Sequence, residues 1–570
     1  MARSSLFRFS PLPNSASDIP WREWDSEVFE AAIASDRPVL LSLAAWWAPS
    51  SHRFDETVFS DDRVAFELAS SVVPLRVDID ERPDVAVRYG ELNHPCIAIL
   101  TPHGELMECL VDPKADDLLS AIEDAHSRWA DNSTELVSEF EGLEAVRIGN
   151  PGLLRGDLTP ALLDISLELT ASGRDPVGPQ TVALWLYARH RRSDLQAEVR
   201  ARASIQRRVD GGGVDRESGE FRHCLDAGDD CDVGRAGVQG EWLQVLAGIA
   251  AEDSEAHAWA FDVVERVIAY LERRLLESTG GFRDSPGDDR SFSGANAAVA
   301  RGLLACGVVF NRSDWRSRGR TAADFIIQRL RGGEAGVYHV WDGTPRQLGL
   351  LADQVASGQA FLDAYEVTGE ADFLSQAQAQ ARLLERQFRN SDGVFQDLDV
   401  LHDSTALLVE RRVPLLENAS AAELMIRLGH LTHDDRYPDA AYAVLGALAG
   451  GVTMTAIDVE GVAALARVAD RLLSVEPEVK VVSFSSPRAR DSIADPLQGE
   501  ALRLVLAAHT VQRLHPGFDD RLIEQLGVVA GTSGAFCFVA GEYGSLLTHA
   551  DELLPAIERQ LAASSDEGRF

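Results

Sequence analysis

A glycine followed closely by an aromatic residue recurs four times in the middle of this chain, and its spacing limits the folds available. The aromatic positions are Phe221, Phe282, Tyr338 and Phe395, each one or two residues after a glycine. The interval of roughly 57 residues suits two helices and two loops, so each repeat predicts one helical hairpin. The intervening sequence is rich in Ala, Leu and Arg. About four to six such hairpins would close into an (α/α)6 toroid, with the glycine-aromatic loops around the mouth of a central cavity.

Residues 22–130 show a different pattern, in which short apolar runs alternate with helical stretches. The sequence predicts strands at 38–46, 72–79, 96–100 and 105–111, with helices at 52–70 and 115–129. Strand, helix and strand followed by a hairpin and a helix is the order of a thioredoxin-like domain. The C-terminal residues return to a mixed pattern, with strands expected at 479–484 and 534–539 and helices at 495–508 and 550–562.

A chain of 570 residues is too long for one hydrophobic core. We therefore expect a multidomain protein of mixed α/β and all-α class. Residues 1–134 would form the thioredoxin-like domain, residues 135–477 the (α/α)6 six-hairpin-type toroid, and residues 478–570 a small C-terminal α/β segment.

The charge balance is strongly acidic, with 90 Asp and Glu against 54 Lys and Arg and a net charge of −36. Lys114 and Lys480 are the only lysines in the chain. Dispersed acidic charge with little lysine is typical of halophilic proteins, because carboxylates hold water and strong screening reduces their mutual repulsion. A haloarchaeon is the expected source, and an ordinary acidic cytosolic protein is the alternative. Nucleic acid is excluded as a partner, because its binding needs clustered positive charge.

Residues 1–20 contain no apolar core of a signal peptide, and no stretch reaches the length of a membrane helix. The six cysteines are sparse and irregularly spaced, as in a reducing compartment. We therefore expect a cytoplasmic protein that has no membrane partner.

Short motifs along the chain resemble those of one known family. In the first domain they lie at 19–21, 24–31 and 37–42, in the acidic Val-Asp-Ile-Asp-Glu-Arg-Pro-Asp-Val stretch at 77–85, at Pro95 and at 100–104. Weaker matches follow at Asn296, 351–353, 417–418 and 548–553. Together they resemble the family typified by spermatogenesis-associated protein 20. That resemblance implies a thioredoxin-like domain joined to a toroid of the six-hairpin glycosidase type.

The chain departs from this family at the redox site. Where the family carries Cys-His-Trp-Cys-His, residues 48–52 read Ala-Pro-Ser-Ser-His. A CxxC site works because a thiolate at a helix N-terminus has a lowered pKa and attacks disulfides. Ala48 has no nucleophile and the Ser51 hydroxyl is too basic to ionise, whereas His52 and a cis Pro95 would remain as scaffold. The sequence therefore predicts a degenerate CxxC site that is redox-inactive.

Three further positions bear on chemistry. Cys96 follows the proline and is expected to be a small buried hydrophobe, with a reactive thiol as the alternative. In the toroid, residues 231–240 match none of the ionisable positions of the family's His-Phe-Glu-Lys-Met stretch. Near the C-terminus Cys537 stands where the family has one cysteine of a pair, and Gly544 stands near its partner's place.

Metal-binding interpretations of the sequence are weak. His223, Cys224 and Cys231 lack the fourth ligand of a zinc site, and the acidic run at 226–232 does not follow the spacing of an EF-hand loop. The acidic cluster at 78–84 favours a structural role over catalysis. We therefore expect no metal and no cofactor.

The toroid cavity is the place where we expect any remaining chemistry, because glycosidases need one protonated and one ionised carboxyl across a cleft. Tyr338, Trp341 and Phe282 could stack on a sugar ring. The candidate cavity residues in loops or at helix starts are Asp284, Tyr338, Trp341, Asp342, Asp353, Asp397, Asp399 and Glu417.

The leading functional hypothesis is a redox-inactive member of the family that binds an unknown small molecule, such as a carbohydrate, or a protein partner at the toroid mouth. One alternative is a carbohydrate-active enzyme, either a glycoside hydrolase or a sugar epimerase, that uses the toroid cavity. Another is a chaperone-like protein that binds extended peptide beside Pro95. Fold analogy alone does not rank these alternatives.

Overall fold

The computed structural model describes most of the chain. The described residues are 9–90, 95–149, 156–171, 177–192, 194–215, 217–222, 234–252, 254–402, 404–449, 458–474, 478–482, 500, 510–514, 523–524, 526–527, 534–539 and 542–566. The chain divides into two compact units. None of the helices in the described part is both long and apolar enough to cross a membrane.

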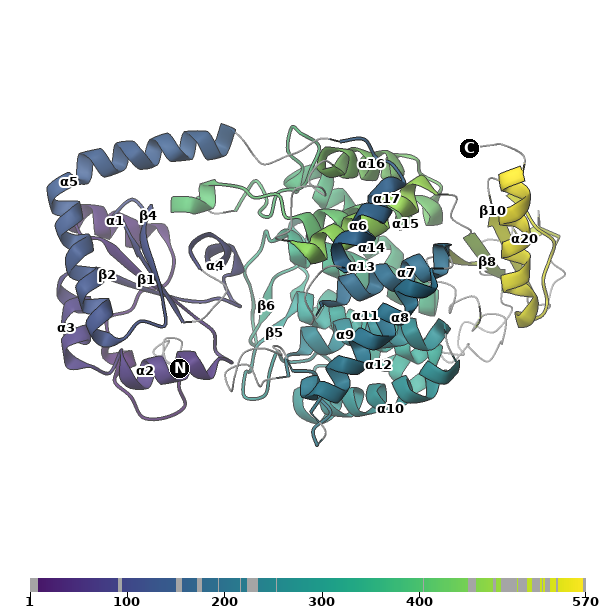
Figure 1. Ribbon diagram of the computed structural model, residues 1–570, viewed down its shortest axis with the longest axis horizontal. Helices are drawn as coiled ribbons and strands as arrows, with labels where there is room; N and C mark the ends of the chain where they lie inside the picture. Colours follow the sequence, from purple (N-terminus) through teal and green to yellow (C-terminus); the bar gives the residue numbers. More distant parts are fainter. Residues whose placement is uncertain are drawn as a thin grey trace. The chain divides into compact units, whose positions relative to one another are not determined.

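The first unit is built on a four-stranded sheet with the order β2-β1-β3-β4. Figure 1 labels β1, β2 and β4 of this sheet, together with helices α1 to α5. Strand β1 pairs in parallel with β2 and antiparallel with β3, which in turn pairs antiparallel with β4. This is the order and direction of a thioredoxin-like sheet, as the sequence predicted. The strands are β1 (Val39–Ala44), β2 (Val73–Asp78), β3 (Cys96–Leu100) and β4 (Leu106–Val111).

Helices pack on this sheet through its alternating side chains. Leu40, Ile97 and Ile99 form a fully buried core with α3 and α5, and the intervening Leu41 and Leu43 are buried on the other face. The helix expected at 52–70 is two helices, because the Asp61 carboxylate accepts from the Arg63 N–H and begins a new one. The helices are α1 (Ser26–Ser35), α2 (Pro49–Thr57), α3 (Asp62–Ser70), α4 (Pro83–Tyr89) and α5 (Ala115–Gly149).

A segment from the middle of the chain, Asp397–Arg412, belongs to this first unit. Arg88 of α4 forms a 2.9 Å ion pair with Asp397 and donates to the Leu407 carbonyl at 3.0 Å. His402 Nε2 lies 3.1 Å from the buried Asp84 carboxylate. Asp84 is thereby a structural residue, in agreement with the expectation for the acidic cluster at 78–84.

The second unit is an α/α ring. Among the described residues, twelve helices of about three turns or more, α6 to α17, form this ring. Five consecutive hairpins each pair an inner helix with the outer helix that follows it, and α6 packs on α17 as the sixth pair. The inner helices are α7 (Pro179–Arg192), α9 (Ala236–Glu252), α11 (Ser293–Val309), α13 (Leu351–Thr368), α15 (Leu415–Thr432) and α17 (Val459–Leu473). The outer helices are α8 (Leu195–Arg208), α10 (Ser254–Tyr270), α12 (Ser313–Phe325), α14 (Ala371–Leu383), α16 (Arg436–Leu448) and α6 (Ala161–Ala171).

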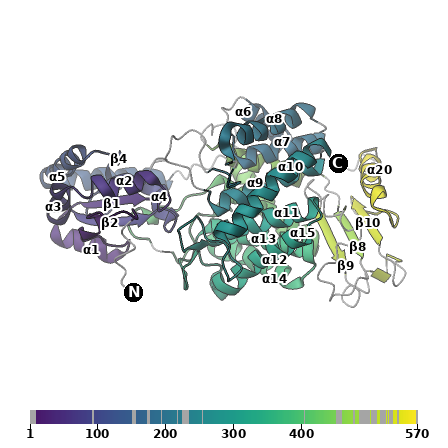
Figure 2. The same cartoon turned by 90° about the horizontal axis from the view of Figure 1, so that it is seen from below.

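The inner helices contact one another in sequence order, and α17 also packs on α7, so the ring is closed. Figure 2 shows the ring helices from a second side. Small residues permit the close approach of α9 and α11: a Cβ on Gly240 would lie 2.3 Å from the Val299 nitrogen, and one on Gly302 would lie 2.6 Å from the Gly240 oxygen. The closed (α/α)6 toroid is therefore present, as predicted.

Each of the recurring glycine-aromatic loops is held by a pair of hydrogen bonds to one side-chain amide, an arrangement that we call a latch. In each loop a side-chain amide from the start of the next inner helix accepts from one backbone N–H and donates to the carbonyl of the same residue. Asn296 does so with Phe282 at 2.8 and 2.9 Å, and Asn418 with Phe395 at 2.8 and 2.8 Å. Gln239 holds Phe221 in the same way. The rings of Phe221, Phe282 and Phe395 are fully buried, so Phe282 cannot stack on a sugar.

The third repeat is displaced by one residue from the alignment that the sequence suggested. Here Gln354 holds Val337, at 2.8 Å to its N–H and 2.9 Å to its carbonyl, instead of Tyr338. Each latch ties the loop after an outer helix to the next inner helix. The repeat period therefore reflects ring construction, and not a set of ligand contacts at the mouth.

The contact between the last and first inner helices depends on carboxylates of α17. Glu460 accepts from the Gln180 N–H at 2.7 Å, from the Thr181 N–H at 3.2 Å and from the Thr181 hydroxyl. These are donors in the first turn of α7, which has no intrahelical acceptors for them. Further along α17, Asp470 accepts from the Tyr187 hydroxyl at 2.8 Å. The two carboxylates thus connect the last inner helix, α17, to the first, α7.

A second four-stranded sheet follows the ring, with the order β11-β10-β8-β9. It confirms the strands expected near 479–484 and 534–539, whereas the helix expected at 495–508 falls almost wholly outside the described residues. The terminal helix is α20, which begins after a short 3-10 turn. The elements are β8 (Glu478–Val482), β9 (Thr510–Leu514), β10 (Gly534–Val539), β11 (Glu542–Tyr543) and α20 (Leu553–Asp566).

Replacing Glu460 with Ala should destabilise the toroid, because it leaves three donors of α7 without an acceptor. We expect a loss of about 1–3 kcal/mol in the free energy of unfolding, measured by urea titration. Asp372→Ala is the matched control, because it removes an exposed carboxylate from the first turn of another ring helix. Its effect should stay within about 0.5 kcal/mol. Equal effects of the two substitutions would contradict the role of Glu460.

Candidate functional site

The predicted redox site contains no nucleophile. Ala48 precedes α2 and provides no side-chain cap. The Ser51 hydroxyl is fully buried and accepts from the Ala45 N–H at 3.2 Å, while His52 Nε2 lies 2.7 Å from the Trp46 carbonyl. Both side chains therefore hold the strand-to-helix turn in place.

Beside this site, Pro95 accepts from the Asp112 N–H at 3.0 Å through its carbonyl. Cys96 begins β3 and is fully buried, and it also has a second cysteine beside it. Its sulfur lies 2.9 Å from the sulfur of Cys109 on β4. Sequence reasoning overlooked this neighbour because the register of β3 against β4, which brings the thiols together, cannot be read from cysteine spacing alone.

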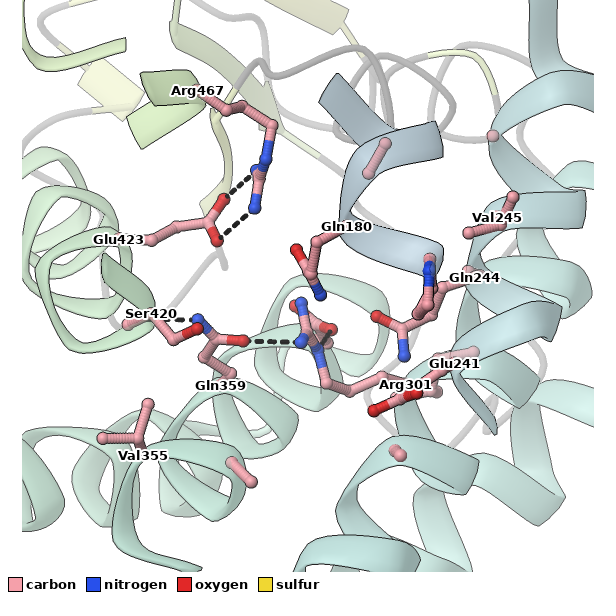
Figure 3. Close-up of a pocket in the computed structure, with 18 of the residues that line it drawn as sticks. Gln180, Glu241, Gln244, Val245, Arg301, Val355, Gln359, Ser420, Glu423 and Arg467 are labelled. Atoms are coloured by element: carbon pink, nitrogen blue, oxygen red, sulfur yellow. Dashed lines mark hydrogen bonds and ion pairs between the residues drawn. The ribbon is translucent and has the colours of Figure 1, made fainter. Parts of the chain in front are cut away.

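The second unit encloses a cavity of about 460 Å³ that is lined from all six inner helices. This volume lies within the range of small-ligand sites, roughly 300–1,000 Å³. Figure 3 shows Gln180, Glu241, Gln244 and Arg301 directed toward the same space. The cavity is thus the central space of the ring, and its lining is polar as well as apolar.

One side of the cavity holds an ion-pair network between three inner helices. Arg301 of α11 donates to Asp363 at 2.7 Å and to the Gln359 side chain at 2.5 Å. Arg427 of α15 donates to Asp363 and to Glu366, both at 2.7 Å. Burial alone would raise the pKa of Asp363, but the two guanidinium groups lower it below its usual value.

A second network joins α15 to α17. Arg467 donates to both oxygens of Glu423, at 2.7 and 3.1 Å (Figure 3). Arg471 donates to the same carboxylate at 3.2 Å. Burial opposes ionisation of Glu423, yet the two guanidinium groups lower its pKa far below the usual range. Glu423 is therefore ionised, and its charge is satisfied within the wall.

Two other cavity carboxyls titrate near neutral pH. Burial raises the pKa of Glu366 to about 7, which Arg427 opposes and Asp363 reinforces. The Glu241 side chain is exposed to the cavity, but desolvation by the surrounding ring, followed by the negative charge of Glu460, raises its pKa to about 7. Within the described part of the chain, Glu366 Oε1 and Arg467 Nε are buried without a hydrogen-bond partner. Such atoms mark places where a ligand or water can bind.

Of the eight cavity residues predicted from the sequence, Glu417 at the start of α15 lines the cavity. Asp284 pairs instead with Arg235 at 2.8 Å, and Asp353 binds the Ser293 hydroxyl at 2.7 Å and His339 at 3.0 Å. Asp342 forms a 2.8 Å ion pair with Arg346. These three carboxylates are engaged in loops and helix starts of the ring.

The remaining four candidates are also placed elsewhere. Asp397, paired with Arg88, and Asp399, which accepts from the Leu401 N–H at 2.9 Å, belong to the first unit. Tyr338 and Trp341 are half-buried and pack against the ring core. Among the described lining residues Tyr187 is the aromatic one. The expected aromatic platforms are therefore not part of this cavity.

A pattern in the sequence of the inner helices marks the residues that line the cavity. The inner helices are rich in Ala, Gly and Leu, and isolated charges interrupt them at helical spacing: Glu423 and Arg427, Arg467 and Arg471, Asp363 and Glu366. Charges three or four residues apart share one helix face. In a helix that is otherwise buried, such a face must meet either partners or water.

Among the described residues, no cluster of three or more His, Cys, Asp or Glu side chains could hold a metal ion. His223, Cys224, Cys231 and the acidic run at 226–232 lie outside the described residues.

A thioredoxin-like domain joined in one chain to a closed six-hairpin toroid is the class of protein that this fold defines. Residues 11–121 match the family model described as "Thioredox_DsbH: Protein of unknown function, DUF255". Spermatogenesis-associated protein 20 of Homo sapiens is 28% identical over 78 residues, which is 14% of this chain and 10% of that protein. The Rattus norvegicus protein gives the same values. The first domain of the chain is therefore similar to the corresponding part of spermatogenesis-associated protein 20, and the match spans about a tenth of these relatives' length.

Solved structures resemble parts of the chain at low identity. Cellobiose 2-epimerase from Bacillus thermoamylovorans gives a TM-score of 0.41 at 9% identity, covering 47% of this chain and 73% of that one. D-mannose isomerase gives 0.41 at 14% identity, covering 52% and 87%. Unsaturated glucuronyl hydrolase from Bacillus sp. gives 0.39 at 17% identity, covering 51% and 82%.

The raised pKa of Glu366 predicts a pH-dependent stability. A carboxyl with a higher pKa in the folded than in the unfolded chain binds its proton more tightly when folded. The stability that Glu366 adds to the folded chain is therefore fully present below the ordinary glutamate pKa of 4.5, and it is lost as the pH rises toward 7. The full loss is about 3 kcal/mol at most. Glu366→Gln should reduce this slope by roughly half, because Glu241 titrates in the same interval.

Urea unfolding between about pH 5 and pH 8 measures the slope. Glu265→Gln is the control, because its side chain is 58% exposed and it should leave the slope unchanged. A slope that is the same in the Glu366→Gln variant and the unmodified protein would contradict the assignment.

Proposed function

We propose that the toroid cavity binds a small, uncharged, hydroxyl-rich ligand, with a saccharide as the fitting chemical class. The observation that carries the proposal is the balance of charge in the cavity wall. The described lining includes four Arg and five carboxyl groups, and two of these carboxyls have a pKa of about 7. The wall therefore provides hydrogen-bonding groups without a large net charge.

The arginines favour this class of ligand over an anion. Arg301 and Arg427 share Asp363, and Arg467 and Arg471 share Glu423. A phosphate or sulfate would have to displace these carboxylates or be held beside them, which costs energy because like charges repel. An uncharged ligand leaves both networks intact.

The groups left for a ligand hydrogen-bond readily to hydroxyls. Gln180 of α7 and Gln244 of α9 present side-chain amides to the cavity, next to the Glu241 carboxyl (Figure 3). An amide both donates and accepts, and a carboxyl near its pKa can do either. This alternation of donors and acceptors matches the hydroxyl groups of a sugar.

A second candidate function is catalysis on that ligand. Glycoside hydrolysis uses one protonated and one ionised carboxyl. Glu241 and Glu366 hold a proton near neutral pH, whereas Glu423 and Asp363 are ionised in the same cavity. This difference in pKa favours an acid–base role, which would be tested after binding has been found.

Binding is tested by calorimetry with glucose, mannose and cellobiose as neutral probes and with glucuronate and phosphate as anionic probes. The titrations are run in low and in molar NaCl because of the acidic composition. We expect at least one neutral saccharide to bind, and Glu241→Ala or Gln244→Ala to weaken it about tenfold, or about 1.4 kcal/mol. Exposed Glu265→Ala should leave the affinity unchanged.

Two results would contradict the proposal. One is binding of glucuronate or phosphate with no binding of any neutral saccharide. The other is neutral-saccharide binding that is unchanged by both cavity substitutions, because the ligand would then occupy another place.

A further inference from the structure

Two cysteines face each other across the β3–β4 hairpin of the first unit. The sulfurs of Cys96 and Cys109 are 2.9 Å apart, closer than non-bonded carbon atoms approach, ~3.5–4.0 Å. A disulfide bond is about 2.05 Å long, so the sulfurs need to approach by less than about 1 Å.

The register explains the contact. Cys96 is opposite Val111, and Ala98 is opposite Cys109, so the two cysteines occupy diagonal positions. Opposite residues of an antiparallel pair lie on the same face, and so do residues two apart on one strand. Cys96 and Cys109 therefore share a face, and the twist of the hairpin closes the diagonal.

The two thiols differ in exposure. Cys96 is fully buried in β3, whereas Cys109 is half-buried in β4, which forms an edge of the sheet. Cys109 also lies 3.8 Å from the Tyr89 carbonyl. An external reagent can therefore reach the half-buried Cys109 thiol more easily than the fully buried Cys96 thiol.

The other described cysteines lack such a neighbour. Cys306 is fully buried and donates to the Leu243 carbonyl at 3.3 Å. Burial raises the pKa of Cys537 to about 11. These two thiols provide internal controls, because both are buried and neither lies beside a second cysteine sulfur in the described part of the chain.

The geometry points to a reversible disulfide between Cys96 and Cys109, formed by exchange with a small-molecule disulfide. The Cys109 thiolate attacks one sulfur of the reagent, which forms a mixed disulfide and releases one small thiolate. The Cys96 thiolate then attacks the Cys109 sulfur and releases the second small thiolate. The protein loses two protons and two electrons, and the reagent is reduced to two thiols.

This site is separate from the empty CxxC positions. Ala48 and Ser51 lie at the start of α2, whereas the cysteine pair joins the two C-terminal strands of the sheet. The inference also does not depend on ligand binding in the toroid, so either proposal can fail without the other.

The test incubates the full-length protein with oxidised glutathione at about pH 8.5, where ordinary thiols are partly ionised. Unfolding in the presence of iodoacetamide follows, and peptide mass spectrometry is done without reduction. We expect a Cys96–Cys109 cross-linked peptide and loss of alkylation at these two positions, with Cys306 and Cys537 still alkylated. Dithiothreitol treatment should restore alkylation of the pair.

Two variants test the order of attack. Cys96→Ser should leave Cys109 as a stable glutathione mixed disulfide, because the resolving thiol is gone. Cys109→Ser should leave Cys96 unmodified, because it is buried. Circular dichroism establishes that each variant is folded, and the unmodified protein gives the main result without any substitution. Full alkylation of Cys96 and Cys109 after oxidised glutathione, or a cross-link to another cysteine, would overturn the inference.

Discussion

The hydrogen bonds of the Glu460 carboxylate to the first turn of α7 connect the end of the helical ring to its beginning. Gln180 and Thr181 would otherwise leave backbone donors unpaired at a buried helix terminus. Burial raises the pKa of Glu460 while these hydrogen bonds oppose the shift, so the interaction is a balance between desolvation and capping. This contact, together with the Tyr187–Asp470 hydrogen bond, joins α17 to α7 and so helps to close the ring around the cavity. Arg467 of α17 then pairs with Glu423 of α15, and Gln180 of α7 lines the cavity.

Two kinds of polar residue organise the inner helices, and they have different roles. The amides Gln239, Asn296, Gln354 and Asn418 are buried and fix the loop before each helix, so they set the orientation of that helix in the ring. The charged residues a few turns further along then meet at the centre. Because buried charges are costly unless paired, the Arg301–Asp363–Arg427 network also selects one arrangement of α11, α13 and α15. A polar cavity is therefore a consequence of how the ring is built.

Much of the fold could be predicted from the sequence, and less of the site. The strand and helix order of the first domain followed from apolar runs, and the toroid followed from the repeat of roughly 57 residues, because both are local or periodic signals. Carboxylates that follow the glycine-aromatic loops are predicted cavity residues because loop acids often lie at the opening of a toroid. In the structure, Asp284, Asp353 and Asp397 instead have Arg, Ser or His partners that the sequence does not reveal. The Cys96–Cys109 contact depends on strand register, which the sequence does not show. In the third loop Gln354 binds Val337, which directly follows Gly336, whereas in the other loops the bound residue is two positions after the glycine; Tyr338 is therefore not the equivalent of the other three aromatic residues.

The central claim is that the closed ring keeps an open, nearly neutral polar cavity for an uncharged ligand. The most direct measurement is a crystal structure of the full-length protein soaked with a neutral saccharide at saturating concentration. The account predicts electron density for the sugar within hydrogen-bond distance of Gln180, Glu241 or Gln244, with the Arg427–Asp363 and Arg467–Glu423 pairs intact. A ring centre filled by side chains, or sugar density found only outside the ring, would contradict it.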